Sequence, residues 1–418
     1  MKVTLVNKSD IRGGAAIACY RLFKALNQGG CKANLLVQQK ITEDAGISTT
    51  TNTWIKRKWI FFQFVLEKMI FLFYEKSKEI RFSFSLANTG ENISKRKVIT
   101  DADIIHIHWI NQAYLSLGSI KKLINLKKPV IITLHDMWSF TGGCHYAGSC
   151  DHFKVECGYC PYLINPHPKD ISFRILKKKA KIFKDANITV VGCSQWMAEL
   201  AKKSSLFKNT RVESISNPIN TDIFKPSDKM DSRKIFGFPE DKLLILFGAA
   251  NIFETRKGLR LLYIALEILK SRYPELIYKV ELVLFGKANY PLTLPFTTHY
   301  VSYRNTEEEL ATLYNASDIF VLPSLEDNLP NTIMESLSCG TPVIAFNTGG
   351  IPEMIDHLSN GYLAQLESSE DLAEGIYWSL FKADREHLAQ NARKKVLEKY
   401  SPQIIAEKYI SLYKQILV

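Results

Sequence analysis

One stretch of the chain combines residue types that could bind a diphosphate and a ribose. It runs from Ser324 to Glu353 and reads SLEDNLPNTIMESLSCGTPVIAFNTGGIPE. Where a helix begins, unpaired N–H groups and a partial positive charge suit an anionic phosphate. About one turn further in, the carboxylate of Glu335 could accept two ribose hydroxyls. On pattern alone, an ordinary αβα unit with a solvated Glu335 is the simpler interpretation.

Local signals in this stretch predict a helix, a strand and a turn. The residues typical of a helix start are Asn328, Pro330 and Asn331. Gly340 ends the helix, and the apolar run Val343–Phe346 is short and β-branched enough to be a buried strand. The pair Gly349-Gly350 predicts a turn where a ligand approaches closely, and Pro352 opens a second helix.

The stretch resembles the donor-binding signature of the retaining, nucleotide-sugar-dependent glycosyltransferases of family 4, which have two Rossmann-like lobes (the GT-B fold). Their pattern is a Glu, seven residues, a second Glu, then small-Gly-Thr-Pro-Val and Gly-Gly-x-x-Glu. Glu335, Cys339–Val343 and Gly349–Glu353 match this pattern. Asp327 stands where the first Glu is expected and Glu326 precedes it, so either carboxylate could contact the transferred sugar.

By the same resemblance, two backbone turns contact the donor. The first is the helix start, whose N–H groups bind the diphosphate and whose residues are Leu329, Pro330, Asn331 and Thr332. The second is the loop after the first strand of the chain. There Gly13 and Gly14 match a Gly-Gly loop that lines the cleft in the family, although a lone Gly-Gly is a weak signal.

The family also carries Gly-Arg and then Lys-Gly in its second domain, and that Arg and Lys bind the diphosphate. Here Lys257-Gly258 matches, Ala249 stands at the Arg position, and Arg256 is the nearby substitute. Because the N-terminus of a helix disfavours a cation, a lysine at this place indicates an anion nearby.

Histidines follow two apolar runs of the first half. His135 comes directly after Val130–Leu134 in a Thr-x-His setting, at the edge of the sheet where ligands bind. The resemblance implies that His135 contacts the transferred sugar and that Asp136 orients it. Without the resemblance His135 would be a structural histidine, and His106 and His108 are less specific.

A cysteine-rich insert spans residues 141–161. Its cysteines are Cys144, Cys150, Cys157 and Cys160. Four thiolates at such short spacing can complete a closed, tetrahedral, structural zinc site. Reduced buried thiols or redox pairing would explain them equally well. Most members of the family lack this insert, which resembles that of a subgroup of capsule and exopolysaccharide enzymes with a Trp-Ser-Phe-Thr-Gly-Gly-Cys-His-Tyr run.

Residues 54–84 interleave aromatic side chains with Lys and Arg. At helical spacing, this pattern is typical of a helix that lies in a membrane interface. A core helix with a basic outer face would explain the pattern equally well. The basic cluster Lys177–Lys179 favours the membrane interpretation.

The net charge of +12 is unevenly distributed. Residues 1–215 hold 33 Lys and Arg against 16 Asp and Glu, whereas residues 216–418 hold 21 against 26. A basic first half indicates an anionic partner, which could be acidic phospholipid, a phosphorylated substrate or nucleic acid. Since no signal peptide or bilayer-spanning run is visible, we expect a cytoplasmic protein that is peripheral at the inner face of the cell membrane.

The length of the chain, its apolar runs and the helical segments between them predict two doubly wound α/β domains, and the resemblance implies that they face each other across a cleft. Domain one covers residues 1–215 and includes the helix 54–84 and the cysteine-rich insert. Domain two covers residues 216–400, and a final amphipathic helix, 401–418, crosses back to the first domain in this fold. By the resemblance, domain one binds the acceptor and domain two binds the donor.

We therefore expect a retaining glycosyltransferase that moves a sugar from a nucleoside-diphosphate sugar to a glycan or lipid-linked oligosaccharide in bacterial surface polysaccharide synthesis. It needs no catalytic metal if Lys257, Arg256 and N–H groups offset the charge of the leaving diphosphate. Retention without an obvious nucleophile suggests front-face attack, in which the leaving phosphate oxygen takes the acceptor proton. The expected partners are the donor, the acceptor and an anionic membrane, but no nucleic acid.

Two rival interpretations remain. A sugar-nucleotide epimerase or a phosphorylase can share the fold, but neither explains the basic aromatic segment. A non-enzymatic, zinc-containing adaptor on anionic membrane or nucleic acid would explain the charge but not the donor signature. Nucleotide-sugar turnover, liposome pelleting and gel shifts with RNA or DNA would separate the three.

Overall fold

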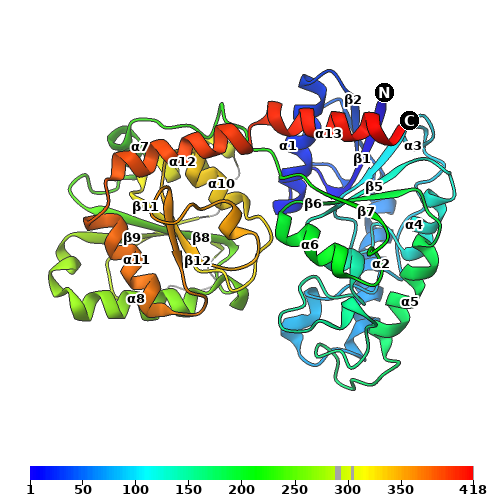
Figure 1. The fold of residues 1–418 in the computed structure, drawn as a ribbon, viewed down its shortest axis with the longest axis horizontal. Coiled ribbons are helices and arrows are strands. Elements are labelled where there is room, and N and C mark those ends of the chain that lie inside the picture. Colours follow the sequence, from blue (N-terminus) through cyan, green and yellow to red (C-terminus); the bar gives the residue numbers. More distant parts are fainter. Residues whose placement is uncertain (288–292, 303–305, 418) are drawn as a thin grey trace. The chain divides into compact units, whose positions relative to one another are not determined.

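The chain divides into two compact units (Figure 1). Unit 1 comprises Met1–Asn217 and the chain from Ile405 onward, and unit 2 comprises Pro218–Ile404. The computed structural model describes residues 1–287, 293–302 and 306–417. Val418, the last residue of the expected final helix, therefore lies outside the described residues.

Unit 1 is built on a sheet of seven parallel strands in the order β3-β2-β1-β4-β5-β6-β7. The strands are β1 (Lys2–Ser9), β2 (Lys32–Gln39), β3 (Ile47–Thr49), β4 (Ile104–Ile107), β5 (Val130–Leu134), β6 (Ile188–Gly192) and β7 (Arg211–Ser214). Strands β4, β5 and β6 are buried throughout, as expected for apolar runs covered by helices on both faces. The strand order reverses between β1 and β4, and ligands of such sheets bind beyond the carboxyl ends of the strands at that point.

The helices of unit 1 include one from the far end of the chain. They are α1 (Gly14–Gln28), α2 (Trp54–Leu72), α3 (Lys97–Thr100), α4 (Leu117–Ile124), α5 (Ile171–Phe183), α6 (Gln195–Lys203) and α13 (Pro402–Leu417), with the 3-10 turns η1 (Lys78–Phe82), η2 (Trp138–Phe140) and η3 (His152–Lys154). Helix α13 lies beside α1 on one face of the sheet (Figure 1), where Leu22 and Leu26 share a core with Tyr409 and Tyr413.

A buried histidine ties α13 to the sheet. His106 of β4 is hydrogen-bonded through Nδ1 to the hydroxyl of Tyr413 at 2.8 Å and through Nε2 to that of Thr133 at 2.7 Å. Burial, helped by the neighbouring His135, lowers the pKa of His106 to about 3. His106 is therefore a neutral structural residue.

Unit 2 repeats the arrangement with six parallel strands in the order β10-β9-β8-β11-β12-β13. The strands are β8 (Leu243–Asn251), β9 (Val280–Lys287), β10 (Thr298–Val301), β11 (Ile319–Leu322), β12 (Val343–Phe346) and β13 (Gly361–Ala364). The helices are α7 (Lys229–Phe236), α8 (Leu259–Arg272), α9 (Glu307–Ala316), α10 (Asn331–Ser338), α11 (Ser369–Phe381) and α12 (Arg385–Lys399), with the 3-10 turns η4 (Thr255–Lys257), η5 (Pro274–Tyr278) and η6 (Ile351–Glu353). Here the order reverses between β8 and β11.

The predicted fold class, a pair of doubly wound parallel α/β sheets, is confirmed. Two local predictions are wrong. Segment 54–84 is not one helix, because α2 ends at Leu72 and turns follow it. Pro352 opens only the three-residue η6, which is too short to provide the second helix N-terminus that was expected.

Candidate functional site

Two loops of unit 2 meet at the reversal point of its sheet. The loop after β8 carries Arg256 and Lys257, and the loop after β11 carries Asp327. Lys257 Nζ lies 2.7 Å from Asp327 Oδ2, and Arg256 Nη1 lies 3.2 Å from the same oxygen. The residues singled out in the sequence thus come together at the position where sheets of this topology bind ligands.

The carboxylate of Asp327 is buried but ionised. Burial alone would raise the pKa of Asp327, but the cations of Lys257 and Arg256 hold it below its usual value. Ser324 Oγ and the Asn328 N–H also donate to this carboxylate, at 3.4 and 3.2 Å. Both cations are therefore already paired with a carboxylate in this structure.

Two glycines bring these loops together. At Gly258, with φ of 73°, a Cβ atom would lie 1.8 Å from the Pro323 carbonyl oxygen. At Gly349, with φ of 59°, a Cβ atom would lie 1.9 Å from the Asp327 carbonyl oxygen, which also accepts a hydrogen bond from the Gly350 N–H at 3.1 Å. On its Cβ side, Gly349 thus faces the backbone of Asp327, and the expected approach of a ligand to the Gly-Gly turn stays a prediction.

Glu335 lies on α10, one turn into the helix, and is only 4% exposed. Tyr314 of α9 donates its hydroxyl hydrogen to Glu335 Oε2 at 3.2 Å. The prediction of a solvated helix residue is therefore wrong, because Glu335 is held by a buried tyrosine. In the turn before it, Leu329, Asn331 and Thr332 each carry a backbone N–H, but Pro330 has none, so it contributes only its fixed φ to the helix start.

The contacts of Arg256 indicate which carboxylate, that of Glu326 or that of Asp327, stands in for the first Glu of the family pattern. Its Nη1 donates to the backbone carbonyl of Glu326 at 2.6 Å, and its Nε donates to Glu254 Oε1 at 3.0 Å. The carboxylate that faces both Lys257 and Arg256 belongs to Asp327. Asp327 is thus the better candidate for that position.

In unit 1, the half-buried His135 pairs with the buried His108. His135 Nε2 lies 2.9 Å from His108 Nδ1, and His135 Nδ1 lies 3.7 Å from the thiol sulfur of Cys193. Burial lowers the pKa of His135 to about 4, although Asp136 opposes this, and burial also lowers the pKa of His108 well below its usual value. Both rings are therefore neutral near pH 7, and His135 is not a proton acceptor of ordinary basicity.

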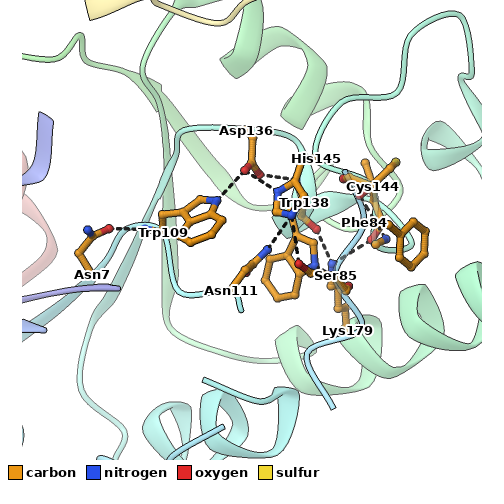
Figure 2. Close-up of polar contacts among 12 residues, drawn as sticks. Asn7, Phe84, Ser85, Trp109, Asn111, Asp136, Trp138, Cys144, His145 and Lys179 are labelled. Atoms are coloured by element: carbon orange, nitrogen blue, oxygen red, sulfur yellow. Dashed lines mark hydrogen bonds and ion pairs between the residues drawn. The ribbon is translucent and has the colours of Figure 1, made fainter. Parts of the chain in front are cut away.

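Asp136, expected to orient His135, holds a different set of residues (Figure 2). Trp109 Nε1 donates to Asp136 Oδ2 at 2.9 Å, and His145 Nδ1 lies 2.6 Å from the same oxygen. On its other side, His145 Nε2 lies 3.1 Å from Ser85 Oγ and 3.4 Å from Asn111 Nδ2. This network fixes the start of the cysteine-rich insert to the end of β4.

Lys179 was assigned to an exposed basic cluster, but it is fully buried. Its ammonium donates to the carbonyls of Trp138 and Thr141 and lies 3.7 Å from the centroid of the Trp138 ring (Figure 2). Burial lowers its pKa to about 7. Of the predicted cluster, only Lys177 and Lys178 are exposed, and Lys177 pairs with Glu156 at 2.5 Å.

The four cysteines of the insert line one small cavity of about 20 Å³. All four are free thiols, and burial raises the pKa of Cys144, Cys157 and Cys160 to about 12. Within the described residues, no three His, Cys, Asp or Glu side chains are arranged to hold a metal ion. Zinc at Cys144, Cys150, Cys157 and Cys160 stays a prediction. It requires about one zinc per chain by elemental analysis, and freely titratable thiols in the folded protein would contradict it.

Three contacts were not predicted from the sequence: the hydroxyl of Tyr314 on Glu335, the ring of His108 on His135 and the ring of His145 on Asp136. Only the contact of His108 could have been expected from the sequence, since His108 follows β4 and His135 follows β5, and these two strands pair. The other two residues reach the site through packing that no local pattern reports.

Comparison with known proteins decides the family. Residues 12–223 match the family described as Glycosyltransferase Family 4, and residues 228–395 match that described as Glycosyl transferases group 1. The chain belongs to glycosyltransferase family 4. The enzyme is 26% identical over 338 residues to the putative colanic acid biosynthesis glycosyl transferase WcaC of Escherichia coli K12, which covers 75% of this chain and 76% of that protein.

Two further similarities bear on substrate and fold. Over 120 residues, 28% of this glycosyltransferase and 31% of the relative, the chain is 32% identical to the N,N'-diacetylbacillosaminyl-diphospho-undecaprenol alpha-1,3-N-acetylgalactosaminyltransferase of Campylobacter jejuni. The structure of Anabaena Alr3699/HepE in complex with UDP-glucose matches with a TM-score of 0.63 at 15% identity and covers 99% of this chain and 100% of that one. That likeness confirms the expected GT-B fold. Among the described residues, each helix is too short or too polar for a bilayer crossing.

Proposed function

We propose that this glycosyltransferase is retaining and uses a nucleoside-diphosphate sugar bound by unit 2. The observation that carries the proposal is the pairing of Lys257 and Arg256 with Asp327 at the reversal point of the sheet, next to the helix that holds Glu335. In support, the Anabaena protein HepE, which has the same fold, was crystallised in complex with UDP-glucose.

Each residue of unit 2 then has a chemical task. Lys257 and Arg256, with the N–H groups of Leu329, Asn331 and Thr332, offset the charge that develops on the leaving diphosphate. Glu335 accepts the ribose hydroxyls, and its burial and its bond to Tyr314 fix its rotamer. Asp327 contacts the transferred sugar and keeps the two cations in position before the donor arrives.

In unit 1, His135 has a positioning task. A neutral imidazole donates or accepts a hydrogen bond but does not take a proton in the chemical step, which agrees with a mechanism where the leaving phosphate oxygen takes the acceptor proton. We further propose that unit 1 serves the acceptor side, that its Gly13-Gly14 loop contacts the acceptor and not the donor as the resemblance had implied, and that the acceptor is a glycan or lipid-linked oligosaccharide of bacterial surface polysaccharide synthesis. The names of WcaC and of the Campylobacter relative support this.

The test is a panel of UDP-, GDP- and ADP-sugars, first by thermal shift and then by turnover, since a ligand that binds the folded state raises its melting temperature. We expect one nucleotide class to stabilise the protein, and Glu335→Ala to weaken binding of that nucleotide. NMR of the product's anomeric proton should show that the donor's configuration is kept. Inversion, or unchanged nucleotide binding and turnover in both Glu335→Ala and Lys257→Ala, would overturn the proposal.

A further inference from the structure

A second group of cations lies in unit 1, at the carboxyl ends of β1, β2 and β4. These strand ends and α2 enclose a cavity of about 1020 Å³. The cations that line it are Lys8, Arg12, Lys40 and Arg57, and no Asp or Glu occurs among the described residues of its lining. A cavity of this size with one sign of charge attracts and holds an anion.

The four cations are not equivalent. Lys8 donates to the Gln112 carbonyl at 2.6 Å and to Gln38, and Lys40 donates to the carbonyls of Asp44 and Ile47, both at 2.8 Å. Neutral carbonyls hold these two ammonium groups in place, while Glu67 and Glu91 act on the charge of Lys8 and Asp44 acts on that of Lys40 from outside the lining.

Arg12 and Arg57 are exposed at the cavity and form no ion pair within the described part of the chain. The Arg57 side chain donates from Nε to the neutral Thr51 carbonyl at 3.4 Å. The guanidinium groups are therefore available for a phosphate, which they can bind in a bidentate manner.

Helix α1 also favours an anion in this cavity. It begins at Gly14, has no acidic residue in its first turn, and both Gly13 and Gly14 line the cavity. A Cβ atom on Gly13 would meet no atom within 4 Å, so the glycine serves the backbone conformation, with φ of 95°, and not a lack of space. The partial positive charge of this helix end adds to that of the four cations.

The opposite wall of the cavity is apolar and continues onto an exposed surface. Ile60, Phe61 and Phe64 of α2 line the cavity. Along the same helix and just after it, seven large apolar residues are each more than half exposed: Trp54, Ile55, Trp59, Phe61, Phe62, Met69 and Phe73. By contrast, Glu67 and Lys68 of α2 are buried. The helix thus presents its apolar side chains outward, which excludes the alternative of a core helix with a basic outer face.

We propose that this cavity binds the phosphate or diphosphate of an acceptor that is esterified to a long apolar chain. The anion lies between Arg12 and Arg57 at the start of α1, and the chain leaves the cavity past Phe61 and Phe64 along the exposed face of α2. A soluble phosphate would have no use for the apolar wall, and an uncharged glycan would have none for the cations. The inference rests on the proposed function, since it specifies the acceptor class of that transfer.

Binding of four probes to the full chain, without any donor, tests the proposal. The probes are farnesyl phosphate, farnesol, glucose 1-phosphate and inorganic phosphate. We expect farnesyl phosphate to bind at least tenfold more tightly than the other three. Arg12→Gln with Arg57→Gln should weaken farnesyl phosphate binding by roughly tenfold or more, since each substitution removes charge-assisted hydrogen bonds. The control, Lys177→Gln with Lys178→Gln, removes two exposed cations outside the cavity and should change nothing.

The apolar wall is tested separately. Phe61→Ser with Phe64→Ser should weaken binding of farnesyl phosphate and leave that of inorganic phosphate unchanged. If glucose 1-phosphate binds as tightly as farnesyl phosphate, the ligand is a soluble phosphate and the proposal is overturned. Equal binding of farnesol, or no binding of farnesyl phosphate, overturns it as well. Because no donor is present, these outcomes are independent of whether nucleotide-sugar turnover is found.

Discussion

Both units place cations beyond the carboxyl ends of the strands of a doubly wound sheet, yet the two sites differ in how that charge is balanced. In unit 2 the cations of Lys257 and Arg256 are paired with the buried Asp327. In unit 1 the cations of Arg12 and Arg57 face a cavity whose described lining holds no carboxylate. Equivalent topology thus supports one site whose cations are paired with a carboxylate and one whose described lining carries only positively charged side chains.

The two arrangements of cations suit different tasks: those of unit 2 are held in a fixed geometry, and those of unit 1 attract an anion. A paired cation is fixed in position before the ligand arrives, which suits stabilisation of charge that develops during a reaction. An unpaired group of cations draws an anion from solution and is weakened by salt. We therefore expect the unit 2 site to matter for the rate of the chemical step and the unit 1 cavity to matter for capture of a substrate.

The largest effect should come from removing the unit 2 cation. Lys257→Ala should lower the transfer rate by about 10²–10³-fold, the usual loss when one preorganised group that stabilises developing charge is deleted. Steady-state kinetics with the donor found in the panel measures it. Lys270→Ala, an exposed lysine of α8, is the control and should keep full activity. A loss of less than threefold in Lys257→Ala would contradict the assignment.

The second prediction makes unit 1 resemble unit 2. Gln39 lines the cavity, so Gln39→Glu introduces a carboxylate there with almost no change in shape. The affinity for farnesyl phosphate should fall by roughly tenfold, because the new charge repels the anion and pairs with the nearby cations. Gln28→Glu, at the exposed end of α1, makes the same chemical change away from the cavity and should leave the affinity unaltered.

The third prediction compares the units at acid pH. Burial holds the pKa of His106 at about 3 in folded unit 1, below the unfolded value near 6.5, so below pH 6.5 the unfolded state binds a proton that the folded state does not. Through this residue, the free energy of unfolding of unit 1 should therefore fall by about 1 kcal/mol between pH 6.5 and 5.5. This change lowers the ratio of folded to unfolded protein by a factor of about five. His108 and His135 shift in the same direction. Asp327 in unit 2 has a lowered pKa and should lose its stabilising charge only in stronger acid.

Hydrogen exchange at pH 7 and pH 5.5, corrected for intrinsic rates, measures this difference. Amides of β4 and β5 should lose protection at pH 5.5, whereas those of β11 and β12 should keep it. His106→Gln should reduce the loss in unit 1. Equal changes in both units would show that buried histidines do not set the acid sensitivity.

The smallest effect should come from making unit 2 resemble unit 1. Asp327→Asn removes the carboxylate between Lys257 and Arg256 and leaves both cations without that partner. The affinity for the nucleoside diphosphate alone should rise by about threefold, because the phosphates then no longer compete with Asp327 for the two cations. Transfer should fall at the same time. Weaker nucleotide binding in Asp327→Asn, measured by calorimetry, would mean that the carboxylate itself supports the bound ligand.

The fold was predictable because its signals are local. Strands β5 and β12 have the predicted bounds to the residue, since the ends of a short, continuous apolar run mark the ends of a buried strand. Strand β3 reads IST and strand β13 reads GYLA, so neither is a continuous run of large apolar residues that would give such a signal. Ser194, a residue type typical of a helix N-cap, accepts a hydrogen bond from the Met197 N–H at the start of α6.

The site was predictable only in part. Resemblance placed Lys257 and Asp327 in one functional group, but their contact depends on Gly258 and Gly349, each of which allows a close backbone approach that no pattern reports. The sequence did not decide which side of α2 is buried, because the burial of Glu67 and Lys68 depends on the residues that pack around them. For Lys68 these are the carbonyls of Arg81 and Phe84, which its ammonium bonds at 2.9 and 3.2 Å.

The position of α13 decides the order in which the protein can be completed during its synthesis. Residues 218–404 of unit 2 are contiguous, so this unit can form its core as soon as they have left the ribosome. Unit 1 is made first but lacks Ile405, Tyr409, Leu412 and Tyr413 from its core until the last residues appear. Although the N-terminal domain of a nascent chain generally folds first, unit 1 can complete this part of its core only after all residues of unit 2 have been made. A ribosome that stalls within the last turns of α13 leaves unit 2 folded and unit 1 without part of its core.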